Sequence, residues 1–155
     1  MLLRDKIIRI LKEAKEASLV VTNISSKRKD KALSNMAKAL LENTRYLLSE
    51  NDKDVVIARK KGLSKAFIDR LTLTEKRIRE MANSLKQVVG LKDPVGRIIK
   101  KWQRPNRLII KKIAVPIGVI GIIYESRPNV TSDCAGLCLK SGNSCVLRGG
   151  SEAIN

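Results

Sequence analysis

The chain has no histidine, and aromatic residues make up only 3% of its 155 residues. Without histidine, these residues cannot form a serine–histidine catalytic triad or a zinc site with histidine ligands. The three cysteines lie inside apolar segments rather than at the spacings of a disulfide framework or a metal site. This usage is typical of proteins from a reducing compartment.

Long hydrophobic runs are also missing. Five basic residues interrupt the first 21 positions, so these positions do not form the uncharged core of a signal peptide. The longest apolar run, residues 113–124, contains one proline and two glycines and is too short to span a bilayer as a helix. We therefore expect a cytoplasmic protein without a membrane segment.

Basic charge is abundant, and it is unevenly distributed. The formal net charge is +17, and all of this excess falls in residues 1–114, whereas residues 115–155 carry three basic and three acidic side chains. Such a basic segment attracts phosphate backbones, so a helical nucleic-acid-binding protein is one alternative. The lysines are spread around several predicted helices, and few aromatics are available for base stacking, which disfavours nucleic acid as a partner.

Apolar residues recur three and four positions apart through residues 1–92, which predicts four or five amphipathic helices. Ser25 or Ser26 is expected to cap the second helix, and Ser64 the fourth, with a short third helix at about residues 52–60. Residues 72–75 have the spacing of a capping box for the fifth helix, which should stop at Gly90. The predicted inner faces are Leu3, Ile7, Leu11, Ala14 and Ala17; Leu33, Met36, Ala37, Leu40 and Leu41; and Ile78, Met81, Ala82, Leu85, Val88 and Val89.

The remaining residues favour strands. Residues 97–102 and 108–114 predict a β-hairpin. Residues 115–124 form a continuous apolar run, as in a parallel strand that is buried on both faces. A polar turn, a short helix, a second buried strand and a Gly-Gly turn that opens another helix should follow. The expected fold class is α/β, with a helical region 1–92, a hairpin 97–114 and a βαβ unit 115–155.

Three sequence words in this last region are long and specific. They are Tyr124-Glu-Ser-Arg-Pro-Asn-Val-Thr131, Cys138-Leu-Lys-Ser-Gly-Asn143 and Leu147-Arg-Gly-Gly-Ser-Glu-Ala153. They resemble the gamma-glutamyl phosphate reductase family (glutamate-5-semialdehyde dehydrogenases) of the aldehyde dehydrogenase superfamily. The resemblance implies that residues 1–155 are the N-terminal part of a Rossmann-like NADP-binding domain, and that the catalytic domain with the nucleophilic cysteine lies outside this sequence.

The family resemblance also implies an activity. Its enzymes use NADPH to reduce L-glutamate 5-phosphate to L-glutamate 5-semialdehyde and phosphate in proline biosynthesis, after a thiolate has displaced the phosphate. We expect that residues 1–155 alone do not catalyse this reaction, and a non-catalytic remnant is a further alternative. The resemblance implies that the hairpin 97–114 reaches a neighbouring subunit, and hence a homo-oligomer.

Asn129 and Arg127 are the candidate acyl-site residues. By the resemblance, the Asn129 side chain is an oxyanion donor, although Pro-Asn favours a turn for backbone reasons alone. Arg127 is a candidate for binding a substrate anion, either carboxylate or phosphate, and an ion pair with Glu125 or an ordinary surface arginine is an equally good interpretation.

Residues 148–152 are the candidate cofactor site. Gly149 and Gly150 let the backbone approach a ligand closely, and the following helix start offers N–H groups to an anion. Aldehyde dehydrogenases have a lysine that reaches the adenosine ribose at the position of Arg148, and a glutamate one position before Glu152. The resemblance thus implies cofactor contacts at Arg148, Ser151 and Glu152. An arginine suits the 2′-phosphate of NADP whereas a glutamate suits NAD, and the resemblance favours NADP. A Gly-Gly turn beside a solvated ion pair is the structural alternative.

Two further groups are expected to be structural. Gly118 and Gly121 fall inside the predicted strand and do not form a dinucleotide-binding fingerprint. Cys134 and Cys138 are one turn apart on the predicted helix, and Cys145 lies in a predicted strand, so we interpret all three as small apolar core residues.

Overall fold

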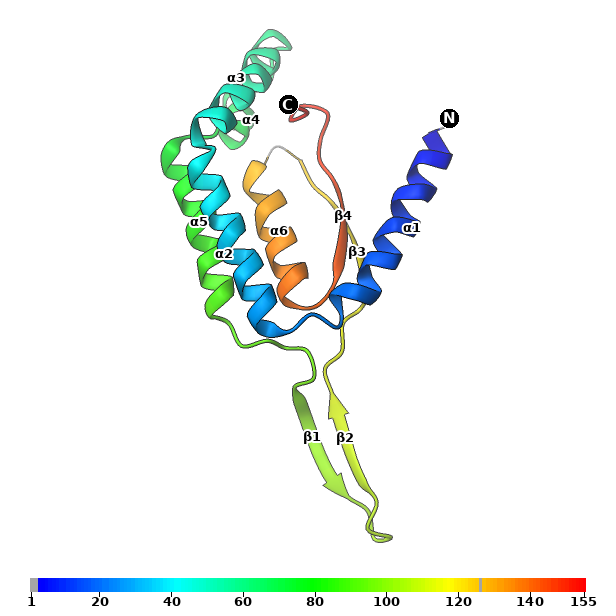
Figure 1. Cartoon of the computed structure of the whole chain (residues 1–155). Helices are drawn as coiled ribbons and strands as arrows, with labels where there is room; N and C mark the ends of the chain where they lie inside the picture. The colour runs from blue at the N-terminus through cyan, green and yellow to red at the C-terminus, as the bar shows by residue number, and fades with distance from the viewer. Residues whose placement is uncertain (1–2, 126) are drawn as a thin grey trace.

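The computed structural model describes residues 3–125 and 127–155. In this part of the chain a group of helices is followed by a hairpin and then by a strand–helix–strand unit (Figure 1). The helices are α1 Leu3–Val21, α2 Ser26–Glu42, α3 Thr44–Lys60, α4 Lys65–Leu71, α5 Glu75–Gly90 and α6 Pro128–Lys140. The strands are β1 Ile98–Gln103, β2 Ile109–Ile113, β3 Val119–Ile123 and β4 Ser144–Arg148.

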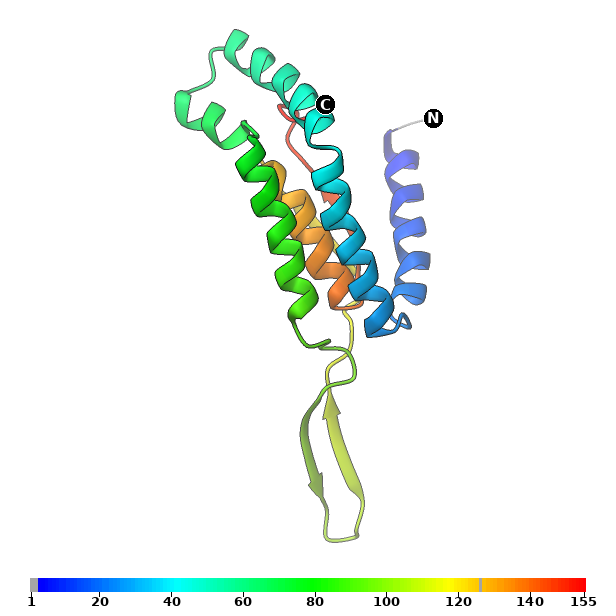
Figure 2. The same cartoon turned by 60° about the vertical axis from the view of Figure 1, so that its left-hand side comes forward.

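The main core lies where α2, α5 and α6 pack side by side (Figure 2). Its central residues are Leu33, Ala37, Ala82 and Leu85, all at most 1% exposed. The predicted inner faces of α2 and α5 are thus confirmed, except that Leu41 is exposed. Gly136 of α6 allows close packing, because a Cβ at this position would lie 2.6 Å from Cδ2 of Leu85.

A second core joins α3 to α4. Val55, Ala58 and Leu71 are buried there. Helix α3 begins at Thr44, well before the predicted residue 52, and only Asn43 separates it from α2. Asn51 links α3 to the segment after α4: its Nδ2 donates to the carbonyl of Leu71 over 2.9 Å, and its Oδ1 accepts from the amide of Leu73 over 2.6 Å.

The helix starts match the predictions in part. Ser25 is the N-cap residue of α2, although its side chain makes no capping hydrogen bond. Ser64 caps α4 by accepting from the amide of Phe67. The predicted capping box is wrong: Thr74 caps α5, and the residue three positions later is Arg77 rather than an acid.

Helix α1 is present as predicted, but its apolar stripe is not covered. Leu3 is 74% exposed, and Ile7 and Leu11 are each 47% exposed. The helix instead packs beside β3 and β4 through its C-terminal half, where Ser18 is buried and Ser144 Oγ donates to the carbonyl of Ala14 over 2.7 Å (Figure 1). The repeat of apolar residues predicted the helix correctly and its inner face incorrectly.

Strands β3 and β4 pair in parallel, from Val119 opposite Ser144 to Ile123 opposite Arg148, and α6 connects them. This arrangement confirms the βαβ unit and the α/β class. Two expectations are wrong. Strand β3 begins after Gly118, whose φ of 115° lies in the left-handed region, and its residues are half-buried or exposed. After Gly150 the described chain forms a turn rather than a helix.

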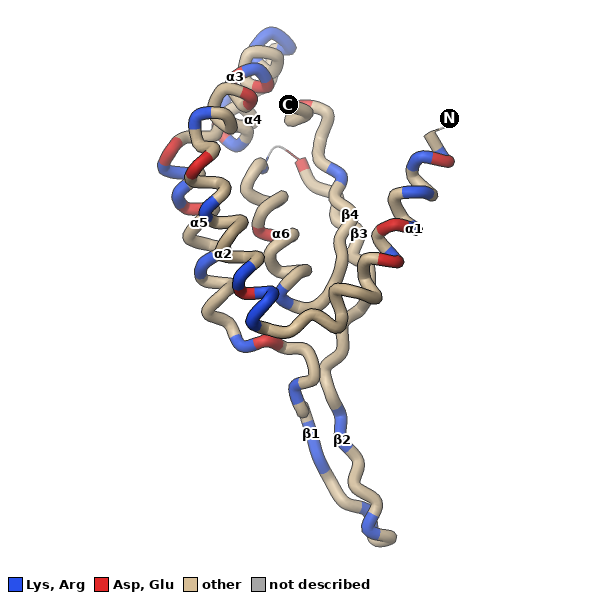
Figure 3. Tube along the Cα trace, viewed as in Figure 1, with Lys and Arg blue, Asp and Glu red and all other residues tan. Residues whose placement is uncertain are grey.

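Strands β1 and β2 form the predicted antiparallel hairpin, which projects away from the helices (Figures 1 and 2). Its side chains are exposed, except that Ile110 is half-buried, and the ammonium of Lys100 lies 5.6 Å from the centre of the Trp102 ring. Lysine and arginine residues occur along the hairpin and over the helices (Figure 3). Within the described residues, no helix is both long and apolar enough to cross a membrane.

Two buried lysines connect α2 to the neighbouring elements. Lys29 Nζ lies 2.9 Å from Asp93 Oδ2, and Lys140 Nζ lies 2.6 Å from Asp30 Oδ1. Their side chains are only 1% and 4% exposed. Burial disfavours the charged form of Asp93, but hydrogen bonds from Lys29, Ser26 and the amide of Val95 outweigh it and lower the pKa of this carboxyl.

Candidate functional site

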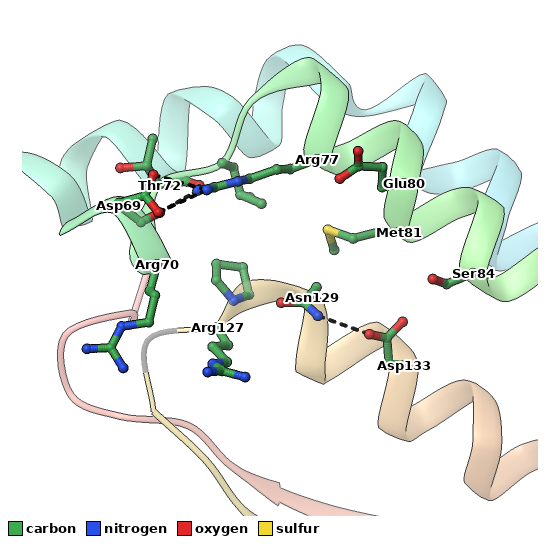
Figure 4. A pocket seen from close by; sticks show the side chains of 12 residues that line it. Asp69, Arg70, Thr72, Arg77, Glu80, Met81, Ser84, Arg127, Asn129 and Asp133 are labelled. Atoms are coloured by element: carbon green, nitrogen blue, oxygen red, sulfur yellow. Dashed lines mark hydrogen bonds and ion pairs between the residues drawn. The ribbon is translucent and has the colours of Figure 1, made fainter. Parts of the chain in front are cut away.

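The start of α6 presents the predicted acyl-site residues. Arg127 is the N-cap residue, and Pro128 occupies the first helical turn, where its missing N–H is not needed. This turn faces α4 and α5 across a cleft of about 320 Å³, which we call the α5–α6 cleft (Figure 4). Its lining includes Asp69, Arg70, Arg77, Glu80, Met81, Ser84, Arg127, Asn129 and Asp133.

The side chain of Asn129 is held by its own helix. Its Nδ2 donates to Asp133 Oδ2 over 3.0 Å, one helical turn away. The second N–H of the same amide donates to no other group among the described residues. Because Asn129 is exposed and lines the cleft, this second N–H is available to a bound oxygen. The oxyanion role of Asn129 stays a prediction.

The arginines of this cleft differ in their partners. Arg77 is bound at both terminal nitrogens, since NH2 lies 3.0 Å from Asp69 Oδ1 and NH1 donates to the carbonyls of Asp69 and Thr72. Arg70 donates through Nε to the carbonyl of Ala66. Within residues 3–125 and 127–155, neither Arg70 nor Arg127 forms an ion pair, so the alternative pair of Arg127 with Glu125 is not formed.

A second cleft, which we call the α3–β4 cleft, has a volume of about 330 Å³ and contains the glycine pair. Tyr124, Thr131, Gly149 and Gly150 are among its lining residues, together with Arg127. Asn129 lines only the first cleft and the glycines only the second, so the structure brings them to adjacent sites rather than to one site. Arg127 borders both.

The predicted cofactor turn is partly as expected. Arg148 ends β4 with its side chain exposed. A Cβ at Gly150 would lie 1.9 Å from the Glu152 carboxylate, so this carboxylate is folded over the glycine, and Ser151 is exposed. The helix start that was expected to supply N–H donors is not formed, because the described residues after Gly150 make a turn. The cofactor roles of these residues stay predictions.

The cysteines lie in α6 and β4 as predicted, but only Cys138 is buried in the core, whereas Cys134 and Cys145 are half-buried. Burial, with a smaller effect of neighbouring Cys145, raises the pKa of the Cys138 thiol to about 11. Burial also raises the pKa of Cys134. Both are therefore mainly protonated at neutral pH, and a thiol is a poor nucleophile. Among the described residues, no group of three or more histidine, cysteine or acidic side chains is placed to hold a metal ion.

Of the residues that line the α5–α6 cleft, only Arg127 and Asn129 were predicted as site residues, and Asp133 and Arg70 are two of those that were missed. Asp133 lies four positions after Asn129, and this spacing on a predicted helix is a signal that the two side chains share a face. Arg70 lies in the last turn of a short helix, and nothing in its local sequence indicates that it faces a cleft.

No protein-family model matches the chain. The chain is 58% identical over 142 residues to a gamma-glutamyl phosphate reductase of Clostridium botulinum, covering 92% of the chain and 34% of that relative. It is 50% identical over 155 residues to the protein of the same name from Geobacter metallireducens, covering 100% of the chain and 37% of the relative. The chain thus spans about a third of the length of the curated relatives that it matches.

Solved structures agree with this similarity. A gamma-glutamyl phosphate reductase from Thermotoga maritima matches with a TM-score of 0.88 at 48% identity, over 92% of this chain and 34% of that one. The protein of the same name from Saccharomyces cerevisiae matches with a TM-score of 0.91 at 31% identity, over 95% of this chain and 38% of that one. A probable aldehyde dehydrogenase from Listeria monocytogenes EGD-e gives 0.69 at 16% identity, over 96% and 30%, and supports the fold alone. The resemblance carried by the three sequence words is confirmed.

Proposed function

We propose that this chain is the N-terminal part of the NADP-binding domain of a cytoplasmic gamma-glutamyl phosphate reductase. The reaction is the NADPH-dependent reduction of L-glutamate 5-phosphate to L-glutamate 5-semialdehyde and phosphate in proline biosynthesis. One observation carries the proposal: 92% of this chain matches such an enzyme at 58% identity. The position of Asn129, in an open cleft just after the carboxyl end of a parallel strand, supports it. Open α/β sheets bind their ligands at this edge.

The hydrogen bond of Asn129 supports its proposed role as an oxyanion donor. Asp133 fixes one N–H of the amide, so the other is held in one orientation towards the cleft. A donor that is already oriented stabilises the negative oxygen of an acyl-transfer intermediate without reorganisation, and loss of such a donor costs about 10²–10³ in rate. Arg127 is the proposed contact for a substrate anion.

The turn after β4 is the proposed cofactor contact. The exposed Arg148 fits an anionic nucleotide, and Gly149 has room beside it, since an added Cβ would lie 3.6 Å from the hydroxyl oxygen of Tyr124. The cofactor supplies a hydride when it is bound. A guanidinium pairs well with a phosphate, which favours NADP over NAD at Arg148.

A chimera tests the function. The matching third of the Clostridium botulinum relative is replaced by this chain, and the product is expressed in a proline auxotroph that lacks the reductase. We expect growth without proline, and NADPH oxidation that depends on glutamyl phosphate. Asn129→Ala in the chimera should lower the rate about 10²–10³-fold.

Asn83→Ala is the matched control, because Asn83 is an exposed asparagine on α5 outside both clefts. It should leave the rate unchanged. A chimera that folds and binds NADPH but forms no semialdehyde would contradict the proposed function.

The chain alone should not turn over glutamyl phosphate. The raised pKa values of Cys134 and Cys138 leave them mainly protonated at neutral pH, which supports their structural role. Turnover by the purified chain would show that one of the three cysteines is a nucleophile.

A further inference from the structure

One carboxylate oxygen in the α5–α6 cleft has no partner. Asp133 uses Oδ2 to accept the hydrogen bond from Asn129. Its Oδ1 is buried and accepts no hydrogen bond from any of the residues that the structure describes. A buried carboxylate oxygen without a donor is costly, and native structures rarely leave one unsatisfied. Asp133 is only half-buried as a residue and lines the cleft, so a small rotation of its carboxylate would bring Oδ1 to a donor on a bound molecule and remove this cost.

Positive and negative side chains lie at opposite ends of the cleft. Figure 4 shows Arg70 and Arg127 on one side of Asn129 and Asp133 on the other. Neither arginine has a carboxylate partner among residues 3–125 and 127–155, whereas Arg77 is paired with Asp69. The cleft therefore has a positive end, a negative end and an amide donor between them.

We propose that Asp133 is a specificity-determining residue, which accepts a hydrogen bond at Oδ1 from the α-ammonium group of an amino-acid substrate. Arg70 and Arg127 meet the anionic groups of the same molecule. This inference rests on the proposed function, because L-glutamate 5-phosphate carries one ammonium, one carboxylate and one phosphate. A substrate that lacks the ammonium leaves Oδ1 buried and unpaired, so the site rejects it.

A purely structural role for Asp133 makes a different prediction. The hydroxyl of Ser84 lines the same cleft, and Asp133 would then serve only to hold Asn129 and the first turns of α6. Loss of the negative charge of Asp133 would then weaken the binding of every ligand of the cleft equally. Only an ammonium contact makes the effect depend on whether the ligand has an amino group.

The test compares two stable ligands on the purified chain. L-Glutamate 5-hydroxamate has a hydroxamate in place of the acyl phosphate, and glutaric monohydroxamate is the same molecule without the amino group. We expect the first to bind at least about tenfold more tightly in calorimetric or NMR titrations, as for a charge-assisted hydrogen bond in a buried site. Asp133→Asn should reduce this preference to about twofold or less.

The matched control is Glu80→Gln. Glu80 lines the same cleft, but its side chain is 61% exposed and its nearest cation, Lys76, is 4.0 Å away. The charge change is identical, so a preference that survives Glu80→Gln and not Asp133→Asn is due to the buried oxygen. An asparagine at 133 keeps an oxygen to accept from Asn129, and thermal melting of each variant reports whether the fold is intact.

Three results overturn the inference: equal affinity for both ligands, no binding of the hydroxamate that carries the amino group, or a preference that Asp133→Asn leaves unchanged. The chimera separates this failure from that of the proposed function. An active chimera without the ligand preference removes only the role of Asp133. If the chimera is inactive but the purified chain keeps the ligand preference, the proposed reductase function is wrong and the cleft is still a binding site for amino acids.

Discussion

The helical body of α2, α5 and α6 and the hairpin of β1 and β2 use apolar side chains in opposite ways. In the body, Leu33 and Leu85 are at most 1% exposed, whereas Ile98 and Ile109 in the hairpin are 51% and 53% exposed. The hairpin also places Lys100 opposite Lys112 and Lys101 opposite Lys111. Like charges directly opposite each other destabilise a strand pair, and an isolated hairpin is marginal in water. The body is therefore stabilised by its own side chains, and the hairpin is suited to contacts with another surface.

The largest expected effect lies in the buried ion pairs of the body. Asp93→Asn leaves the ammonium of Lys29, which is 1% exposed, without its carboxylate. Breaking one partner of a buried pair costs roughly 3–5 kcal/mol, which urea denaturation at pH 7 would measure. Lys38→Gln, at an exposed pair with Glu42, is the control and should cost less than about 1 kcal/mol.

The same carboxyl sets the acid sensitivity of the body. The pKa of Asp93 is lower in the folded chain than the ordinary value of 3.8 for this carboxyl. Its contribution is complete above this value and is lost as the pH falls through the lower folded pKa. Below about pH 4 the wild-type chain should thus lose stability faster than Asp93→Asn. If the free energy of unfolding of the two proteins changed with pH in parallel, Asp93 would not be the source of the acid sensitivity.

A somewhat smaller effect on stability is expected from truncating an apolar side chain, and it should differ between the helical body and the hairpin. Leu85→Ala should lower the free energy of unfolding by roughly 2–5 kcal/mol, because it leaves a cavity between α5 and α6. Ile109→Ala in the hairpin should change it by less than about 0.5 kcal/mol. Equal losses from the two changes would mean that the hairpin packs against the body in solution.

The smallest effect on stability, and a clear effect on assembly, is expected in the hairpin. If residues 97–114 contact a second copy, as the family resemblance implies, Ile109→Thr should shift the sedimenting species towards monomer with an unchanged melting temperature. Val56→Thr is the control, because Val56 is 46% exposed on α3. A chain that is monomeric at ~0.1 mM, or a control that dissociates it equally, speaks against the hairpin contact.

Local sequence patterns predicted the elements better than their surroundings. The spacing of apolar residues located α2, α5 and the βαβ unit, since these signals depend on neighbouring residues. The same spacing did not show that Leu3 and Ile7 of α1 are uncovered, because burial depends on which element packs against a face. The turn after Gly150 and the early start of α3 also differ from the predictions.

The sequence predicted those residues of the candidate site that belong to a motif, and it missed the cleft residues that belong to none. Asn129 and Arg127 stand in one of the three sequence words, and both reach the α5–α6 cleft. Arg70 comes from a helix nearly sixty residues earlier in the chain, so only the tertiary fold shows its place. Asp133 is close in sequence, but its unpartnered oxygen follows from the packing of α6 against α5.

The missing side chain at Gly136 sets a dimension of the site. Position 136 lies one turn beyond Asp133, at the point where α6 meets Leu85. A single methyl group there would act as a spacer between the two helices and would widen the opening at their other end. The close approach of α6 to α5 beside the cleft thus depends on a glycine outside it, which offers a route to altered selectivity without touching a binding residue.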